Sequence, residues 1–372
     1  MINANDIYSI RNGVDLYLIN DEILTVYFMS TRLRKQFRVS MMTIKLIELL
    51  DGERSVQEIY SLIKENSDSE IDLNGLLEIM SKFSEMNIII KRQEDYLELS
   101  GDMIERYDRQ LNFLSDFLIG KSYIEAQEKL QKSNILIFGC GAIGGDIAVH
   151  LAMCGVESFI LYDNDVVEAS DISRHMFFKE KYIGMNKTDA LEDYLLNINK
   201  KIKVNKVQKS LRPESQIAEL IDAATFVVNT ADEPYIGYTS MKISRYCTQK
   251  RKTHFIAGGF DAHLASTGEL IIPGITPCVD CYANYFKEAL KGWKPKKHPV
   301  QERYLEIGGL SSMSLFSSSY ATIEIIKYIC GLINVKSYSK TRGEFLFTSM
   351  DIEYLNVVRD KECKVCGEIN YE

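Results

Sequence analysis

The sequence lacks the long apolar runs and the excess of basic residues that typify membrane and nucleic-acid-binding proteins. No stretch approaches the roughly 20 apolar residues that a membrane helix needs, and residues 1–9 carry no signal sequence. Asp and Glu (52) outnumber Lys and Arg (44), so the net charge of −8 argues against binding nucleic acid or an anionic membrane through bulk charge. We therefore expect a cytoplasmic protein with no membrane or nucleic-acid partner.

Internal repeats and low-complexity tracts are also missing, and the composition is that of a globular protein. The 372 residues, 46% hydrophobic and 26% charged, are enough for two domains with buried cores. Four of the eight cysteines form two close pairs, Cys278/Cys281 and Cys363/Cys366. In a reducing compartment such pairs indicate a bound metal more than disulfides.

The most informative stretch runs from Asn134 to Asp165. An apolar run ends at the glycine-rich segment 139–144, apolar residues then recur at helical spacing, and a second apolar run ends at Asp163. This order predicts a strand, a tight turn, a helix and a strand. Glycine lets backbone amides approach a phosphate at a helix N-terminus, and an acid at the end of the next strand suits the ribose hydroxyls. The predicted nucleotide-binding residues here are Gly139, Gly141, Ala142, Gly144, Asp163 and Asp165.

Two basic residues follow this unit and decide between kinds of nucleotide chemistry. Arg174 and Lys187 place two cations just past the acid that could hold ribose. A dehydrogenase has a similar glycine turn, but attack on an α-phosphate needs more compensation of negative charge than hydride transfer does. The pattern therefore favours nucleotidyl transfer.

The rest of the carboxyl-terminal part alternates strands with helices, which predicts an α/β fold with a doubly wound, mostly parallel, Rossmann-like sheet. Strands are expected at residues 203–207, 225–229, 254–257 and 270–272, and helices at residues 187–197 and 317–330. The lysine-rich segment 287–297 is expected to be a mobile crossover loop.

Residues 1–95 predict a small winged-helix-like α+β domain. Apolar residues alternate from Leu16 to Phe28 as in a hairpin, a helix starts near Met42, and Ser55 and Glu58 form a capping box before the next helix. A third helix is expected at residues 73–86 and a short strand at residues 88–90. Acids and bases are balanced here, so a DNA reader ranks low.

The segment IELLDGERSVQEIYSLI in this domain resembles the small peptide chaperones of pyrroloquinoline quinone maturation. The resemblance implies a peptide-recognition (clamp) domain that adds a precursor peptide as a strand to a sheet edge. A structural or dimerising domain stays open as the alternative. Residues 96–130 are expected to form a helical connecting segment that carries Arg106 and Arg109.

The chain from Arg106 to Cys366 resembles the ThiF/MoeB/HesA-type adenylating superfamily, which includes the ubiquitin-activating enzymes, and within it the microcin C type of peptide adenylyltransferase. The resemblance assigns residues 131–372 to an adenylation domain in which Asp163 binds ribose, Arg174 and Lys187 bind phosphates, and Asp232 positions Mg²⁺. Arg109, with Arg106 beside it, would reach into the site of the partner protomer of a homodimer. Cys278, Cys281, Cys363 and Cys366 would hold a structural zinc ion.

The family pattern is broken at two positions. Asp171 stands where the family usually has Asn, and His175 where it has Gln. An extra carboxylate near a triphosphate is repulsive unless it meets a metal or a base, so the nucleotide stays open between ATP and CTP. Family members that pass their product to a thiol carry a crossover cysteine, and residues 282–329 contain none. Thioester relay is therefore not expected.

The histidines are less informative. His150 follows the glycine turn on a helix and is expected to be packed rather than catalytic. His263 and His298 are expected in loops, the latter within a solvated basic stretch.

Together these features predict a homodimeric, Mg²⁺-dependent nucleotidyltransferase that activates the carboxyl end of a ribosomally made precursor peptide in natural-product biosynthesis. Two alternatives stay open: an adenylyltransferase for a ubiquitin-like sulfur-carrier protein, and a subunit that delivers a leader peptide to a cyclodehydratase. The second is disfavoured because an adaptor needs no triphosphate-binding set such as Arg109, Arg174, Lys187 and Asp232.

Overall fold

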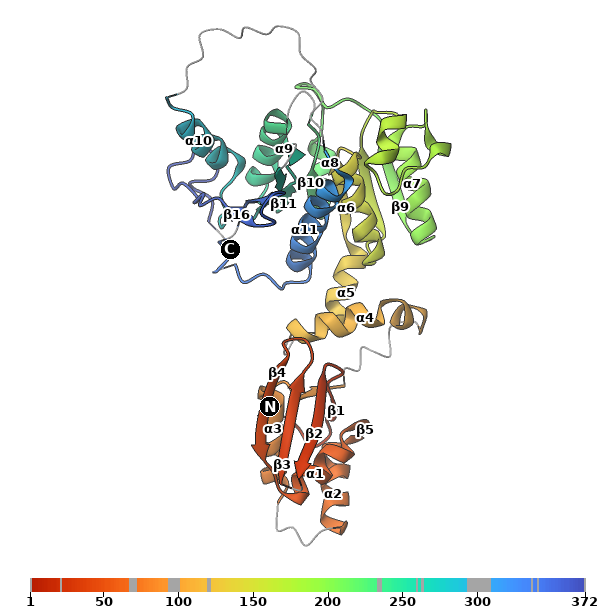
Figure 1. The fold of residues 1–372 in the computed structure, drawn as a ribbon, viewed down its shortest axis with the longest axis vertical. Coiled ribbons are helices and arrows are strands. Elements are labelled where there is room, and N and C mark those ends of the chain that lie inside the picture. The colour runs from red at the N-terminus through yellow and green to blue at the C-terminus, as the bar shows by residue number, and fades with distance from the viewer. Residues whose placement is uncertain are drawn as a thin grey trace. The chain divides into compact units, whose positions relative to one another are not determined.

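The chain divides into two compact units, Met1–Glu125 and Ala126–Glu372 (Figure 1). This computed structural model describes residues 2–20, 22–66, 72–92, 101–118, 122–232, 236–258, 260–261, 264–292, 309–335, 337–339 and 341–370. Helix α4 (Gly101–Phe117), which lies in the expected connecting segment, belongs to the first unit. The three-part division at residues 95 and 130 stays a prediction. Across the described parts of the chain, no helix is long and apolar enough to span a bilayer.

Among the described residues of the first unit, two three-stranded antiparallel sheets and three helices surround one core, and α4 is a fourth helix. The strand order is β5-β1-β6 in one sheet and β2-β3-β4 in the other. The strands are β1 (Ile7–Ile10), β2 (Val14–Asn20), β3 (Ile23–Phe28), β4 (Leu33–Arg38), β5 (Asp51–Ser55) and β6 (Ile89–Lys91). The helices are α1 (Met41–Leu49), α2 (Val56–Asn66) and α3 (Leu73–Glu85). Leu46, Val56, Ile59 and Leu76 are fully buried in the core.

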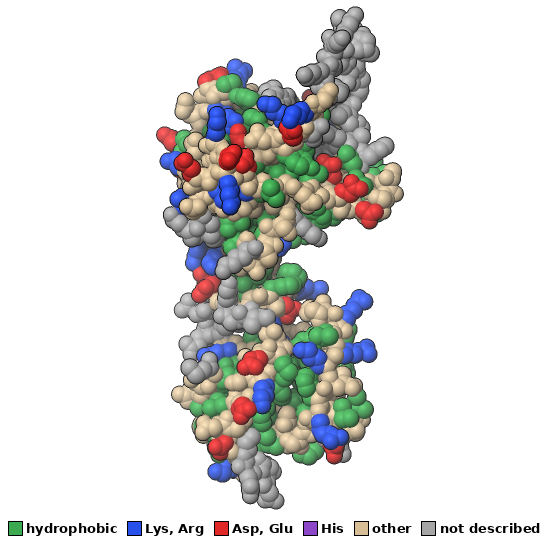
Figure 2. Space-filling view, turned by 90° about the vertical axis from the view of Figure 1, so that its left-hand side faces the viewer, with side chains coloured by type: hydrophobic (Ala, Val, Ile, Leu, Met, Phe, Trp, Pro, Cys, Tyr) green, Lys and Arg blue, Asp and Glu red, His purple; other side chains and the backbone are tan. Residues whose placement is uncertain are grey.

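Local sequence signals explain most of this unit. The expected hairpin is β2 and β3, and Ser55 and Glu58 form the reciprocal capping bonds, with Ser55 N donating to Glu58 Oε2 (2.7 Å) and Glu58 N to Ser55 Oγ (3.3 Å). The basic residues that follow the hairpin form a further strand, β4 (Leu33–Arg38), which the pattern of apolar residues did not predict. It is an exposed edge strand, where charged side chains are tolerated because they face water. Hydrophobic side chains lie intermixed with Lys and Arg on one face of this unit (Figure 2).

The second unit is built on a six-stranded sheet with the order β14-β11-β10-β7-β8-β9. Its strands are β7 (Asn134–Phe138), β8 (Ser158–Tyr162), β9 (Lys203–Val207), β10 (Phe226–Asn229), β11 (His254–Ile256) and β14 (Glu269–Ile271). All neighbours are parallel except β14, which is antiparallel to β11. The predicted doubly wound, mostly parallel sheet is confirmed.

Helices cover both faces of this sheet because alternate strand residues point to opposite sides. They are α5 (Tyr123–Lys132), α6 (Ala142–Met153), α7 (Lys187–Ile198), α8 (Ala218–Ala223), α9 (Ile236–Gln249), α10 (Val279–Ala289) and α11 (Ser311–Ile329). Leu136 and Phe138 of β7 share a core with Ile221 of α8 and Ile243 of α9. On the other face α6 packs along α11.

A second sheet brings the end of the chain back to the unit. It has the order β12-β13-β15-β16, all antiparallel, and consists of β12 (Phe260–Asp261), β13 (Leu264–Ser266), β15 (Gly343–Leu346) and β16 (Ile352–Tyr354). Residues 355–370 follow β16 and carry the second cysteine pair.

Candidate nucleotide-binding site

A cleft of about 860 Å³ opens at the carboxyl ends of β7 and β10. These two strands are neighbours in the sheet, and the strand order reverses between them, so the helices that follow leave a crevice at this point. The lining residues are Gly139, Gly141, Ala142, Ile143, Tyr162, Asp163, Asn164, Asp165, Asp171, Arg174, His175, Lys187, Lys209, Ser210, Leu211, Arg212, Thr230, Ala231, Asp232, Ile236 and Ala257.

The glycine turn after β7 has no room for a side chain at Gly139 or Gly144. Gly139 has a φ of +88°, and a Cβ on it would lie 2.6 Å from Thr230 Oγ1. A Cβ on Gly144 would lie 1.9 Å from the carbonyl oxygen of Gly139. Thr230 Oγ1 donates to that same oxygen at 2.9 Å, which joins the turn to the end of β10. The turn therefore presents the free first-turn amides of α6 to the cleft, as an anion requires.

Asp163 is fixed at the end of β8 by backbone amides. Cys140 N donates to Asp163 Oδ2 (2.6 Å) and Asp165 N donates to Asp163 Oδ1 (2.8 Å). Burial raises the pKa of Asp163, and these two hydrogen bonds oppose the rise. The carboxylate is thus held rigidly beside the glycine turn, where it was expected to receive ribose hydroxyls.

Asp171 lies beside two of the cations that line the cleft. Arg174 Nη2 lies 3.0 Å from Asp171 Oδ1, and Lys187 Nζ lies 3.8 Å from Asp171 Oδ2 and 3.2 Å from Asp165 Oδ2. Burial alone would lower the pKa of Lys187, but Asp171 and Asp165 raise it. Asp171, which departs from the family pattern, therefore pairs with two basic side chains. These pairs offset the repulsion that an extra carboxylate would exert on a triphosphate.

His175 is buried beside Asp171, the carboxylate that pairs with Arg174 and Lys187. Its ring packs against Phe177 and Phe178, with centroids 5.7 and 4.9 Å away, and Nδ1 lies 2.8 Å from the carbonyl oxygen of Asp171. Nε2 is buried and has no hydrogen-bond partner among the described residues. Burial lowers the pKa of His175 to about 4.

Asp232 enters the cleft from the turn after β10. Asn229 shapes this turn, because its Nδ2 donates to Thr239 Oγ1 and Ser240 Oγ (both 3.2 Å) and its Oδ1 accepts from Ala231 N (3.2 Å). Asp232 itself is exposed, and a carboxylate at a phosphate site fits Mg²⁺, which prefers oxygen ligands. Residues 233–235, the rest of the motif, lie outside the described residues.

The structure thus brings every predicted cleft residue together except the two arginines of the connecting segment. Arg106 and Arg109 are exposed on α4 of the first unit, whereas the cleft belongs to the second unit. Their expected role in a partner's site stays a prediction, as do the individual roles of the cleft residues.

Sequence reasoning missed the segment Lys209–Arg212, which lines the cleft after β9. Tyr162 on β8 donates its hydroxyl to Ser210 O at 3.1 Å and so ties the segment to the sheet. A signal was available, because β9 was predicted at residues 203–207 and the carboxyl ends of parallel strands meet at one edge.

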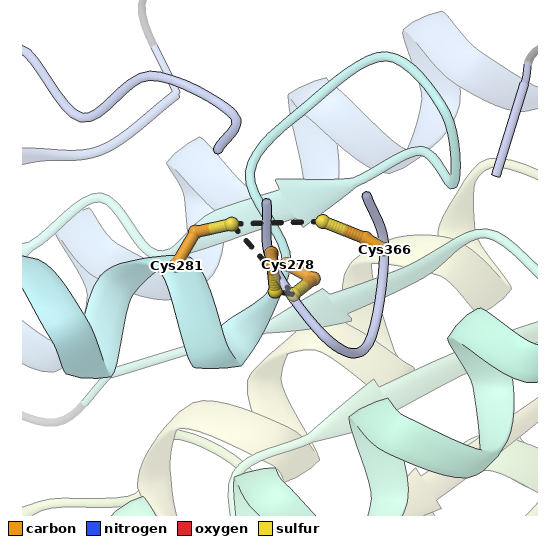
Figure 3. Close-up of side chains that lie close together, drawn as sticks. Cys278, Cys281 and Cys366 are labelled. Atoms are coloured by element: carbon orange, nitrogen blue, oxygen red, sulfur yellow. Dashed lines mark hydrogen bonds between the residues drawn. The ribbon is translucent and has the colours of Figure 1, made fainter. Parts of the chain in front are cut away.

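The four paired cysteines form a buried cluster at the start of α10 (Figure 3). Sulfur atoms of Cys278 and Cys281 are 3.9 Å apart, those of Cys278 and Cys363 3.7 Å, and those of Cys281 and Cys366 3.6 Å. Tetrahedral zinc with Zn–S bonds of 2.3 Å separates its sulfur ligands by about 3.8 Å, whereas a disulfide needs about 2.05 Å. The cluster therefore fits a structural Zn²⁺ with no open coordination position.

An arginine that the sequence did not single out encloses this cluster. Arg359 donates from Nη1 to Gly274 O (3.1 Å) and from Nη2 to Gly367 O (3.2 Å) and to the carbonyl oxygens of Cys366 and Ile369. The tail is thus tied to the body of the unit by backbone contacts as well as by the thiols.

Three of the four cysteines outside the cluster are buried, and Cys154 is partly buried. Cys140, Cys247 and Cys330 are buried, and burial raises the pKa of Cys247 and Cys330 to about 12. Thiolates are therefore disfavoured at these positions. His150 is partly buried on α6, and His263 and His298 lie outside the described residues. The expectation of a loop over residues 287–297 is wrong at its start, because Lys287 belongs to α10, and residues 293–297 lie outside the described residues.

Comparisons with known proteins agree with this geometry. The model of the ThiF family matches residues 107–365. The maize protein "Adenylyltransferase and sulfurtransferase MOCS3-1" is 34% identical over 185 residues, 49% of this chain and 36% of its own length. The chain therefore matches about a third of that relative. "Protein HesA, vegetative" of Trichormus variabilis is 27% identical over 73% of this chain and 92% of its own.

Among solved structures, Escherichia coli MccB with MccA-N7isoASN has the same fold. It matches at a TM-score of 0.70 and 21% identity, covering 98% of this chain and 100% of its own. The likeness extends over both units.

Proposed function

The chain belongs to the ThiF family, and from this premise we propose that it is a Mg²⁺-dependent nucleotidyltransferase that activates the carboxyl end of a ribosomally made precursor peptide. The observation that carries the proposal is the buried carboxylate of Asp171, which holds Arg174 and Lys187 beside the glycine turn. Two fixed cations next to phosphate-binding amides suit a triphosphate.

In the proposed reaction a carboxylate oxygen of the peptide attacks the α-phosphorus, and the bond to the leaving pyrophosphate breaks. Arg174 and Lys187 would offset the negative charge that develops on the phosphoryl oxygens. Asp163 would hold the ribose, and Asp232 would hold Mg²⁺, which supplies further neutralisation of the phosphates. The hydrogen bonds to Asp163 and the ion pairs of Arg174 and Lys187 support this proposal, because groups that are already held in position need little reorganisation during the reaction.

Features of the first unit support a peptide as the substrate. The solved structure that matches both units holds MccA-N7isoASN, and another structure of the microcin C7 biosynthetic enzyme MccB holds N-formylated MccA. The sheet β2-β3-β4 ends in an exposed edge strand, β4, to which an extended peptide could add. A homodimer in which α4 delivers Arg109 to the partner's cleft completes the proposal.

The test is to incubate the protein with Mg²⁺, each nucleoside triphosphate in turn, and a synthetic peptide from a short open reading frame beside its gene. Mass spectrometry should show a peptide carrying one nucleotidyl group, with pyrophosphate released, and Arg174→Gln should form at least about 100-fold less product. Lys200→Gln, at an exposed position that does not line the cleft, is the matched control. Hydrolysis of nucleotide without peptide modification would contradict the peptide assignment.

A second candidate is activation of a ubiquitin-like sulfur-carrier protein, because the maize relative is named as an adenylyltransferase and sulfurtransferase. This second function predicts that the protein exchanges labelled pyrophosphate into ATP only when a carrier protein ending in Gly-Gly is present. A peptide substrate predicts that exchange depends on the peptide and is lost when β4 is blocked by Gln36→Pro.

A further inference from the structure

His175 lines the cleft, and the proposed function gives it no role. Its side chain is 2% exposed, and its Nε2 has no hydrogen-bond partner among the described residues. Nε2 lies 3.9 Å from the position that a Cβ on Gly141 would occupy. Gly141 is the N-cap of α6, so this unpartnered nitrogen faces the end of the helix whose amides are expected to bind phosphate.

The tautomer of the ring follows from its other nitrogen. Nδ1 lies 2.8 Å from the carbonyl oxygen of Asp171, and a carbonyl oxygen can only accept. Nδ1 must therefore carry a proton. In the neutral ring Nε2 then has only a lone pair, which repels a phosphate oxygen. Only the imidazolium, protonated on both nitrogens, satisfies Asp171 O and a phosphate at once.

We propose that His175 is a proton-coupled phosphate ligand: when a nucleoside triphosphate binds, the ring takes one proton from solvent, and Nε2–H donates to a phosphate oxygen at the N-terminus of α6. The proposal rests on the proposed function, since it assumes that the cleft binds a triphosphate. The proton returns to solvent when the phosphates leave, and no bond of the nucleotide breaks in this step.

The charges around the ring explain why protonation waits for the ligand. Burial lowers the pKa of His175 to about 4, Asp171 raises it, and Lys187 and Arg174 lower it further. These are the charged groups that act on the ring, and the rings of Phe177 and Phe178 pack beside it without charge. A triphosphate would cancel the repulsion from both cations and add negative charge beside Nε2, so the pKa rises on binding.

Two substitutions separate the functions of the two ring nitrogens. His175→Gln places an amide donor near the position of Nε2 without any titration. His175→Asn places a donor near Nδ1, keeping the bond to Asp171 O, but cannot reach the phosphate. Circular dichroism and thermal unfolding would establish that both variants are folded before binding is compared.

The experiment is calorimetry with Mg²⁺ and α,β-methylene ATP or α,β-methylene CTP, in two buffers of different ionisation enthalpy at several pH values. Wild-type protein should take up close to one proton more per nucleotide than His175→Gln. Its affinity should fall by up to about tenfold per pH unit as the pH rises between the free and the bound pKa, whereas the affinity of His175→Gln should stay flat. His175→Asn should bind weakly at every pH.

Nitrogen-15 spectra of the imidazoles give a direct second measurement, because the chain has only five histidines. The His175 signals should change from an Nδ1–H neutral ring to an imidazolium when the analogue is added. Equal proton counts for wild type and His175→Gln, or a neutral ring in the complex, would overturn this proposal alone. If neither analogue binds the wild-type protein, the proposed function fails with it.

Discussion

The nucleotide cleft and the cysteine cluster both join segments that are far apart in the sequence, but they do so by different means. In the cleft, backbone amides, two glycines without room for a Cβ, and ion pairs position Asp163, Arg174 and Lys187. In the cluster, four thiols are gathered at the spacing of a metal's coordination shell. The cleft is therefore shaped by contacts within the chain, whereas the cluster presents four thiols that could share a metal ion.

The largest effect that would test this comparison is Gly144→Ala. The added Cβ would lie 1.9 Å from the oxygen of Gly139, so the turn or α6 must move. We expect unfolding to become easier by about 3 kcal/mol and nucleotide binding to be lost. Thermal unfolding and calorimetry would measure both. Gly292→Ala, at a glycine with no atom within 4 Å, is the control and should change neither.

The double substitution Cys363→Ser and Cys366→Ser tests the other side of the comparison. Removing two of four ligands should release zinc and lower the free energy of unfolding by on the order of 4 kcal/mol, since metal-binding energy contributes to folding. Elemental analysis and denaturant unfolding would measure these changes. Cys154→Ser, at a partly exposed cysteine outside the cluster, should retain the metal. Unchanged stability in metal-free protein would contradict the dependence on an ion.

Asp232→Asn should separate chemistry from folding. The side chain is exposed, so the melting temperature should stay the same, while loss of the Mg²⁺ ligand should reduce turnover by about 100- to 1,000-fold. Product formation at saturating nucleotide is the measurement, with the exposed Asp351→Asn as control. Normal turnover in Asp232→Asn would contradict the role of Asp232 as a Mg²⁺ ligand.

A fourth prediction concerns His254 on the buried strand β11, where the effect appears only at acidic pH. Its Nδ1 donates to Lys252 O (2.9 Å), its Nε2 accepts from Ser244 Oγ (2.7 Å), and burial lowers its pKa to about 4. A histidine with a depressed folded-state pKa stabilises the fold above its unfolded value of 6.5. That contribution of about 3 kcal/mol is lost as the pH falls from 6.5 to 4.

His254→Gln should flatten the acid limb of the stability curve, measured by urea unfolding between pH 4 and pH 8. The wild-type loss also contains the titration of His175, so the difference between the two proteins isolates His254. A curve that is equally steep with and without His254 would contradict its burial as a neutral ring.

The two regions also differ in how well the sequence predicted them. The glycine turn, β9 at residues 203–207 and the convergence of Arg174 with Lys187 followed from local pattern and strand order, because the ends of parallel strands meet at one edge. The segment Lys209–Arg212 was missed because polar residues after a strand carry no periodicity. Arg359 was missed because its partners are carbonyl groups, which every residue has.

By itself the sequence determined the alternation of strands and helices, and from it the sheet and the place of the cleft. It also determined the two close cysteine pairs. Each of these features follows from residues that are near one another along the chain. Only the tertiary structure decided what Asp171 does. Its charge looked repulsive in the sequence, but it is buried between two cations. The sign and strength of an electrostatic effect depend on distance and burial, and both are set by the folded chain.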